Sequence, residues 1–396
     1  MRILFVVQRY GEEVGGGAEQ HCRWLAEGLA SFGHDVTVAT SCAIDYMTWR
    51  DSFPSGESEL NGVKIHRFSV EEPRDVESFN ELSRSLDFFG GTHQLDLEDE
   101  WLLSQGPRVS QMAEWLQSNC RDFDVVVPFT YLYRTSQIAI DVCAGQVPVW
   151  MHATAHDEPP FYLRRIRQYL KRVDGFLCST PEEAQLLQGH LDECPPTEIV
   201  GVGVSLSRPE SLESTMRQYG IPLKPYAIIL GRVDESKGVL EGIKYFRAFC
   251  ESEQVGLRLV VVGQNVAGLM SDDLVTLTGF VDPEELSALL MGAEFLIQPS
   301  YFESFSLALC EAWLSATPTL ANGNCEPVAG QTERSGGGLL YRTEEEFIRM
   351  ASRLHRHPRL RRKLAISGRD FVRDNFESHV VLKRIEALLL RVSTRV

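Results

Sequence analysis

The chain has 396 residues, of which 43% are apolar, and a formal net charge of −16. At roughly 150 residues per domain, this length indicates two or three globular domains with a sizeable core. The acidic balance argues against a nucleic-acid partner, because such proteins need a positive surface to meet phosphate. Any anion that the protein binds must therefore be held by a local group of positive charges.

The nine cysteines are scattered along the chain and form no CxxC pair. This usage is typical of reduced thiols, and it predicts neither disulfides nor a zinc site. No apolar stretch approaches the roughly 18 residues that cross a bilayer. The first apolar run is also too short for a signal peptide, so we expect a cytoplasmic protein.

Apolar runs alternate with amphipathic stretches from end to end. The runs of the first half, each expected to form a strand, are 2–7, 35–40, 63–68, 124–129, 147–152, 175–179 and 198–204. A second series follows at 226–231, 257–263, 274–279, 294–300, 318–322 and 337–341. Such continuous runs of Val, Ile and Leu predict strands covered on both faces, hence parallel sheets with helical crossovers.

A polar segment punctuated by Pro and Gly, 205–225, separates the two series. We place a hinge there and expect an α/β protein with two doubly wound, Rossmann-like domains that face a central cleft. In such sheets ligands bind beyond the carboxyl ends of the strands. A weakly patterned insert, 69–123, could form helices beside a ligand site or a separate small core.

The segment "ILGRVDESKG", 229–238, ends an apolar run in glycine and follows it with two spaced cations. Gly231 would let a ligand approach the backbone closely. Arg232 offers a planar fork suited to phosphate, and Lys237 is a flexible positive charge within reach of the same point. Together they could neutralise a diphosphate without a metal; the alternative is two solvated cations near a turn.

The segment "QPSYFESFSLALCEAWLSATP", 298–318, carries two glutamates eight residues apart, Glu303 and Glu311. Ser304 or Ser306 can cap the helix that follows, and Glu311 would lie roughly 12 Å along it. The helix start presents free N–H groups that suit an anion. One element could thus hold a phosphate at its tip, a sugar hydroxyl on Glu303 and a ribose on Glu311. In the simpler alternative, Glu303 pairs with the helix dipole and Glu311 is solvated.

Two histidines in "WMHATAHDEPPFY" compete for a central role. His152 continues an expected strand and could be a hydrogen-bonded core residue, whereas His156 lies beyond the strand end, which favours it. The "GGGAEQ" segment differs from a dinucleotide fingerprint, because Gln20 stands at its third glycine and no carboxylate ends the second strand. The GxxxxGK[ST] pattern is absent as well. A nicotinamide dehydrogenase and an ordinary NTPase are therefore disfavoured.

Taken together, five segments resemble glycosyltransferase family 4, retaining enzymes of the GT-B architecture. They are 15–40, 152–160, 231–238, 260–286 and 303–311, and the last has the E-x₇-E spacing of the family. The resemblance implies metal-independent transfer of a hexose, with retention, from a nucleotide diphosphate-sugar to a hydroxyl of a glycan or lipid-linked acceptor in polysaccharide biosynthesis. A UDP-hexose is favoured as the donor, followed by GDP-mannose, and no cofactor is expected.

With the hinge above, the expected domains are 1–205 on the acceptor side and 206–377 on the donor side. A helix at 378–396 would cross back to the first domain. Two alternatives stay open: a non-catalytic nucleotide-sugar-binding partner of a polysaccharide assembly complex, and a sugar phosphorylase of similar fold. Basic clusters at 164–172 and 356–363 could touch anionic lipid peripherally or be solvated helix faces.

The resemblance also implies roles for single residues. Arg232 and Lys237 would bind the donor diphosphate, and Glu311 would bind the nucleotide ribose. Glu303 would hold hydroxyls of the transferred sugar, and His156 would contact that sugar at the reacting centre. Phe280 and Val281 would line the base pocket, and Gly231 would let the donor approach the backbone. Gly16 and Gly17 would form a loop near the phosphates and the acceptor. The backbone amides that would help to bind the donor are those of Ser304, Phe305, Ser306 and Leu307.

Three places depart from the family's pattern. Ser306 stands where glycine is frequent, and Ala316 stands where a glycine precedes x-Pro. The segment 322–341 differs from the usual GG-x-x-E ending and leaves Glu326 as a further candidate.

Overall fold

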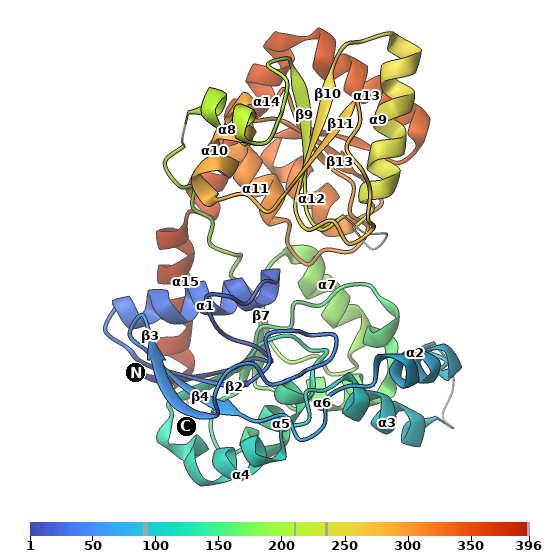
Figure 1. Cartoon of the computed structure of the whole chain (residues 1–396). Coiled ribbons are helices and arrows are strands. Elements are labelled where there is room, and N and C mark those ends of the chain that lie inside the picture. Colours follow the sequence, from blue (N-terminus) through green and yellow to red (C-terminus); the bar gives the residue numbers. More distant parts are fainter. Residues whose placement is uncertain (90–93, 210, 234–236, 394–396) are drawn as a thin grey trace. The chain divides into compact units, whose positions relative to one another are not determined.

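A computed structural model describes residues 1–89, 94–209, 211–233 and 237–393. The chain divides into two compact units, coloured along the sequence in Figure 1. The first comprises Met1–Gly201 and the C-terminal stretch from Leu382 onward, and the second comprises Val202–Val381. The boundary thus lies at 201/202, where the sequence placed it at 205/206. The expected hinge, 205–225, thus belongs to the second unit, and Met216 and Ile221 are buried in its core.

The first unit is built on a mainly parallel sheet. Its strands, in spatial order, are β3 (Gly56–Leu60), β4 (Val63–Phe68), β2 (Asp35–Ser41), β1 (Arg2–Val6) and β5 (Val125–Pro128). Single bridges from β5 lead on to β6 (Trp150–Met151), β7 (Gly175–Cys178) and β8 (Thr197–Ile199). Only β3 runs antiparallel to its neighbour among these described strands. The other pairings confirm the expected parallel topology.

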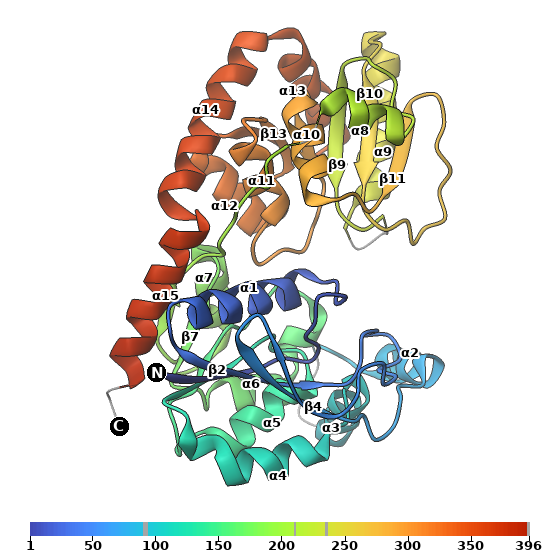
Figure 2. The same cartoon turned by 60° about the vertical axis from the view of Figure 1, so that its left-hand side comes forward.

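Helices cover both faces of this sheet. They are α1 (Gly17–Ser31), α2 (Val76–Ser85), α3 (Leu95–Gln105), α4 (Ser110–Asn119), α5 (Arg134–Cys143), α6 (Arg164–Leu170) and α7 (Pro181–His190). Figure 2 shows α1 on one face, with α4 and α5 on the other. The insert that forms α2, α3 and α4 is no separate core, because Trp101 and Leu116 pack in one cluster with Val126 of β5.

The last helix, α15 (Ser378–Ser393), joins the first unit from Leu382 onward. Leu382 lies against Gly28 of α1, where a Cβ would come within 2.5 Å of the leucine side chain. His34 and Glu386 approach to 2.8 Å, and Arg384 donates to the carbonyl of Val200 at 2.7 Å. These contacts tie the end of the chain to the first unit.

The second unit contains a fully parallel sheet of six strands. In spatial order they are β11 (Val275–Gly279), β10 (Arg258–Val262), β9 (Tyr226–Leu230), β12 (Leu296–Gln298), β13 (Thr319–Asn322) and β14 (Gly338–Tyr341). Its helices are α8 (Leu212–Gln218), α9 (Val239–Glu253), α10 (Pro283–Gly292), α11 (Leu307–Leu314), α12 (Glu326–Ser335), α13 (Glu344–Arg356) and α14 (Pro358–Asn375). Ile228 and Ile229 are consecutive yet belong to different apolar clusters, so both faces of the sheet are buried.

All nine cysteines are free thiols, and eight of them are buried. Within the described ranges, no helix is both long enough and apolar enough to cross a membrane.

Candidate functional site

In the second unit, three glycines let the loops at the carboxyl ends of the strands pack closely. Gly231 follows β9 with φ +143°, and its N–H donates to the carbonyl of Val262 at 2.9 Å. A Cβ on Gly263 would lie 2.2 Å from the carbonyl oxygen of Gly231. A Cβ on Gly238, which has φ +65°, would lie 2.4 Å from the carbonyl oxygen of Pro299. Because only glycine fits these positions, the loop after β9 lies directly against the loop after β12.

This packing brings two of the predicted residues together. The Nζ of Lys237 donates to Oε1 of Glu303 at 2.9 Å. Lys237 is about one-third exposed, whereas Glu303 is largely covered. Arg232 is half-buried at the end of β9. Residues 234–236 of the same loop lie outside the described residues.

The start of α11 is fixed by buried side chains. Ser306 caps the helix, with its Oγ accepting from the N–H of Leu309 at 3.4 Å. The same Oγ accepts from Nε2 of Gln298 at 2.6 Å, and the N–H of Ser306 donates to Oε1 of Gln331 at 3.1 Å. Ser306 is therefore a capping residue, as expected, but its amide is already used. Of the four backbone amides predicted to bind the donor, that of Ser306 is therefore occupied by Gln331.

Glu311 lies one turn into α11 and is partly buried among apolar neighbours. Burial raises the pKa of its carboxyl to about 7. Among the described residues, no donor forms a hydrogen bond or ion pair with this carboxylate. A carboxylate in such a place needs a partner, which the described residues do not supply.

The expected base-binding pair follows β11. Phe280 is 76% exposed, while Val281 packs against the core of the second unit. Phe305 is buried against Phe376, with ring centroids 5.1 Å apart, so its side chain serves packing. Glu326 is exposed at the start of α12.

Sequence reasoning missed several residues of this site. Cys325 is buried beside it, and burial raises the pKa of its thiol to about 12, with Glu303 and Lys237 as charged neighbours. Asn322 donates through Nδ2 to the carbonyl of Pro299 at 3.1 Å and so fixes the loop after β12. Asn322 and Gln298 are polar residues at the ends of apolar strands, and this position is the sequence feature by which they could have been identified.

In the first unit, the loop before α1 rests on a buried ion pair. Gly16 has φ +136°, and a Cβ there would lie 2.3 Å from Oε2 of Glu19. Nε of Arg9 donates to Oε1 of Glu19 at 2.9 Å, and its Nη2 donates to the carbonyl of Gly15 at 3.0 Å. Gly16 is thus required by backbone geometry and by close approach, whereas a Cβ on Gly17 would meet nothing within 4 Å.

The two candidate histidines lie in different surroundings. His152 is fully buried, stacks on Phe129 at 4.8 Å and meets His21 edge-on at 4.5 Å. Within the described part of the chain, neither ring nitrogen of His152 has a hydrogen-bond partner, so this residue belongs to the core without being hydrogen-bonded there. His156 is half-buried in the loop after β6. Glu183 holds that loop by accepting from the N–H of Ala155 at 2.8 Å.

The buried pair His21 and His152 predicts acid sensitivity. Burial lowers the pKa of His21 to about 3 and, together with His21, lowers the pKa of His152. The unfolded chain binds these protons below about pH 6.5, so stability is lost as the pH falls through that value. His152→Phe keeps the stacked ring and removes one titrating group.

We expect the melting temperature of His152→Phe to fall less than that of the wild type between pH 7.5 and 5. Scanning calorimetry across this range measures the difference. Equal slopes for the two proteins would contradict the role of burial.

Across the described ranges, no three His, Cys, Asp or Glu side chains come together as a set of metal ligands.

Comparison with known proteins finds two family models that together match most of the chain. Residues 16–204 match the model of the glycosyl transferase 4-like domain, and residues 213–371 match the model of glycosyl transferases group 1. The chain is similar to the D-inositol 3-phosphate glycosyltransferase of Corynebacterium aurimucosum, with 29% identity over 43% of this chain and 46% of that protein. It is also 24% identical to the glycogen synthase of Mycobacterium tuberculosis, over 81% of this chain and 78% of that protein.

Solved structures share the fold. The sucrose-phosphate synthase of Thermosynechococcus elongatus has a TM-score of 0.73 and 17% identity, with 98% of each chain covered. HepE of Anabaena, solved in complex with UDP and glucose, has a TM-score of 0.70 and 15% identity, again with 98% of each chain covered.

Proposed function

Because the chain belongs to the family 4-like glycosyltransferases of GT-B fold, we propose that it transfers a hexose, with retention, from a UDP-sugar to a hydroxyl of a glycan or lipid-linked acceptor in polysaccharide biosynthesis. The observation that carries this proposal is the group formed by Lys237, Glu303 and the capped start of α11 at the strand ends of the second unit. The UDP and glucose bound by Anabaena HepE favour this donor over GDP-mannose.

The main contribution to catalysis would be stabilisation of the leaving diphosphate. As the bond between the anomeric carbon and the phosphate oxygen breaks, negative charge grows on the diphosphate. Arg232, Lys237 and the other backbone amides at the start of α11 would meet that charge, in place of a bound metal. The acceptor oxygen bonds to the anomeric carbon on the same face, and the departing phosphate takes its proton.

Other residues orient the substrates. Glu303 would hold hydroxyls of the hexose, Glu311 the ribose hydroxyls, and Phe280 the base. In the first unit, His156 would contact the transferred sugar, and the Gly16–Gly17 loop would serve the phosphates and the acceptor. We propose a cytoplasmic enzyme, with peripheral membrane contact through its basic helices if the acceptor carries a lipid.

The test combines binding with chemistry. Thermal-shift assays with UDP-, GDP-, ADP- and dTDP-sugars should show the largest shift with a UDP-hexose. Nuclear magnetic resonance of the product or of the hydrolysed donor should then show a retained anomeric configuration. Turnover only with added inorganic phosphate would instead indicate a phosphorylase. Binding without hydrolysis or transfer to any glycan would indicate a non-catalytic partner.

A further inference from the structure

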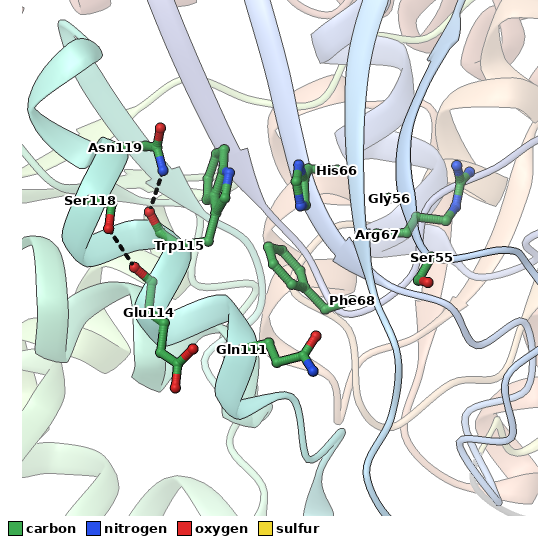
Figure 3. Close-up of a pocket in the computed structure, with 10 residues that line it drawn as sticks. All are labelled: Ser55, Gly56, His66, Arg67, Phe68, Gln111, Glu114, Trp115, Ser118 and Asn119. Atoms are coloured by element: carbon green, nitrogen blue, oxygen red, sulfur yellow. Dashed lines mark hydrogen bonds between the residues drawn. The ribbon is translucent and has the colours of Figure 1, made fainter.

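A hollow of about 510 Å³ opens on the first unit, between helix α4 and the strands β3 and β4 at one end of the sheet (Figure 3). One wall comes from β4, with His66, Arg67 and Phe68. The other comes from α4, which the sequence had left without a role in the insert 69–123. Gln111, Glu114 and Trp115 are among its lining residues. The hollow is large enough for one or two sugar rings, since ligand pockets span about 300–1,000 Å³.

Its floor is a strip of aromatic rings. The imidazole of His66 lies between Phe68 and Trp115, with ring centroids 4.7 Å and 4.9 Å away. Trp115 is half-buried, so part of its indole remains accessible from the hollow. Aromatic surfaces of this kind bind the apolar C–H face of a flat ring and still tolerate polar neighbours.

The rim carries hydrogen-bonding groups suited to hydroxyls. Gln111 and Glu114 are exposed, and among the described residues no partner occupies the Gln111 amide or the Glu114 carboxylate. Asn119 donates through Nδ2 to the carbonyl of Trp115 at 2.7 Å, which leaves its Oδ1 as an acceptor. An amide offers both donors and acceptors, and a carboxylate accepts two hydroxyls.

Charge excludes an anionic ligand. Arg67 is the one Arg or Lys among the described residues that line the hollow, and it is buried. Its guanidinium already donates to Oγ of Ser58 at 2.7 Å and to the carbonyl of Tyr10 at 2.9 Å. Glu114 adds a negative charge at the rim. A phosphate would therefore find a carboxylate and no available cation.

We propose that this hollow binds a neutral oligosaccharide. The inference goes beyond the proposed function, because it concerns a second binding site. β4 lies near the edge of the sheet, and β2, β1 and β5 separate it from β6, after which His156 follows. A site here would hold a part of a glycan chain remote from its reacting end.

The test is isothermal titration with maltoheptaose, cellohexaose and mannohexaose as separate probes of the full-length protein. Binding of at least one is expected, and Trp115→Ala should weaken it about tenfold or more. Because Trp115 also packs against the core, the double variant Gln111→Ala with Glu114→Gln provides a second test at exposed positions. It should weaken binding severalfold without changing the melting temperature.

Two controls separate this site from the donor site. Gln117→Ala, an exposed substitution on the same helix and outside the hollow, should leave binding unchanged. Binding should also persist in Lys237→Ala and in saturating UDP. The proposal is overturned if none of the three probes binds, if UDP or Lys237→Ala abolishes binding, or if the double variant binds as the wild type does.

Discussion

Lys237→Ala is expected to lower kcat by about a hundred- to a thousandfold, while the protein stays folded. One preorganised group at the leaving phosphate contributes this much in comparable sites. In the protein without ligand, Lys237 pairs with Glu303 at 2.9 Å, so its ammonium is already directed to the place where the sugar and diphosphate would meet. Its partial exposure limits the effect on stability to roughly 1 kcal/mol or less.

Steady-state kinetics with the donor found by thermal shift, together with circular-dichroism melting, would measure both effects. The matched control is Lys244→Ala, on helix α9, which begins just after Lys237; its exposed ammonium pairs with Glu344 at 3.2 Å. This variant loses a similar ion pair and should retain full turnover. Wild-type turnover in Lys237→Ala, or an equal loss in both variants, would contradict a role for Lys237 at the diphosphate.

The parallel sheets could be predicted because a strand that is buried on both faces is encoded by a continuous apolar run. Runs such as 226–231 and 257–263 are almost continuously apolar, and the structure places their alternate residues in different clusters. Strand β3 was missed, since Gly56–Leu60 is mostly polar and exposed, and its strand conformation depends on antiparallel pairing with β4. The run 198–204 was overextended, because β8 ends at Ile199 and Val204 instead bridges Glu377 in the second unit.

Within the site, roles that depend on neighbouring residues in the chain could be predicted from the sequence, whereas roles that depend on packing between helices could not. Ser306 could be predicted as a cap because it precedes an apolar helical stretch. Gln331, 25 residues later, could not be predicted to occupy the amide of Ser306, since that contact depends on how α11 and α12 pack. Ala316 has φ +57°, a backbone conformation that favours glycine, the residue that the family resemblance led us to expect there.

Glu311→Gln should make the unliganded protein more stable above pH 7 and weaken donor binding. Burial raises the pKa of Glu311 from about 4.5 in the unfolded chain to about 7. Between these values the folded state binds more protons than the unfolded state, so stability falls as the pH rises, and the penalty is complete above pH 7. Glutamine has the same shape and no charge. Since the side chain is partly exposed, we expect a gain of about 1–2 kcal/mol at pH 8.

The same substitution should weaken UDP binding about ten- to a hundredfold, because a charge-assisted hydrogen bond to the ribose becomes a neutral one. Melting curves at pH 5 and pH 8, each with and without UDP, separate the two effects. The ligand-free melting temperature should rise by a few degrees at pH 8 and hardly at pH 5, and the shift caused by UDP should shrink at pH 8. Glu345→Gln, an exposed change on α13, is the control and should alter neither.

A stabilised variant that still binds UDP normally would show that Glu311 is buried for another reason and would remove it from the donor site. A variant that loses UDP without gaining stability would instead show that the carboxylate already has a favourable partner in the free protein, contrary to its surroundings in α11.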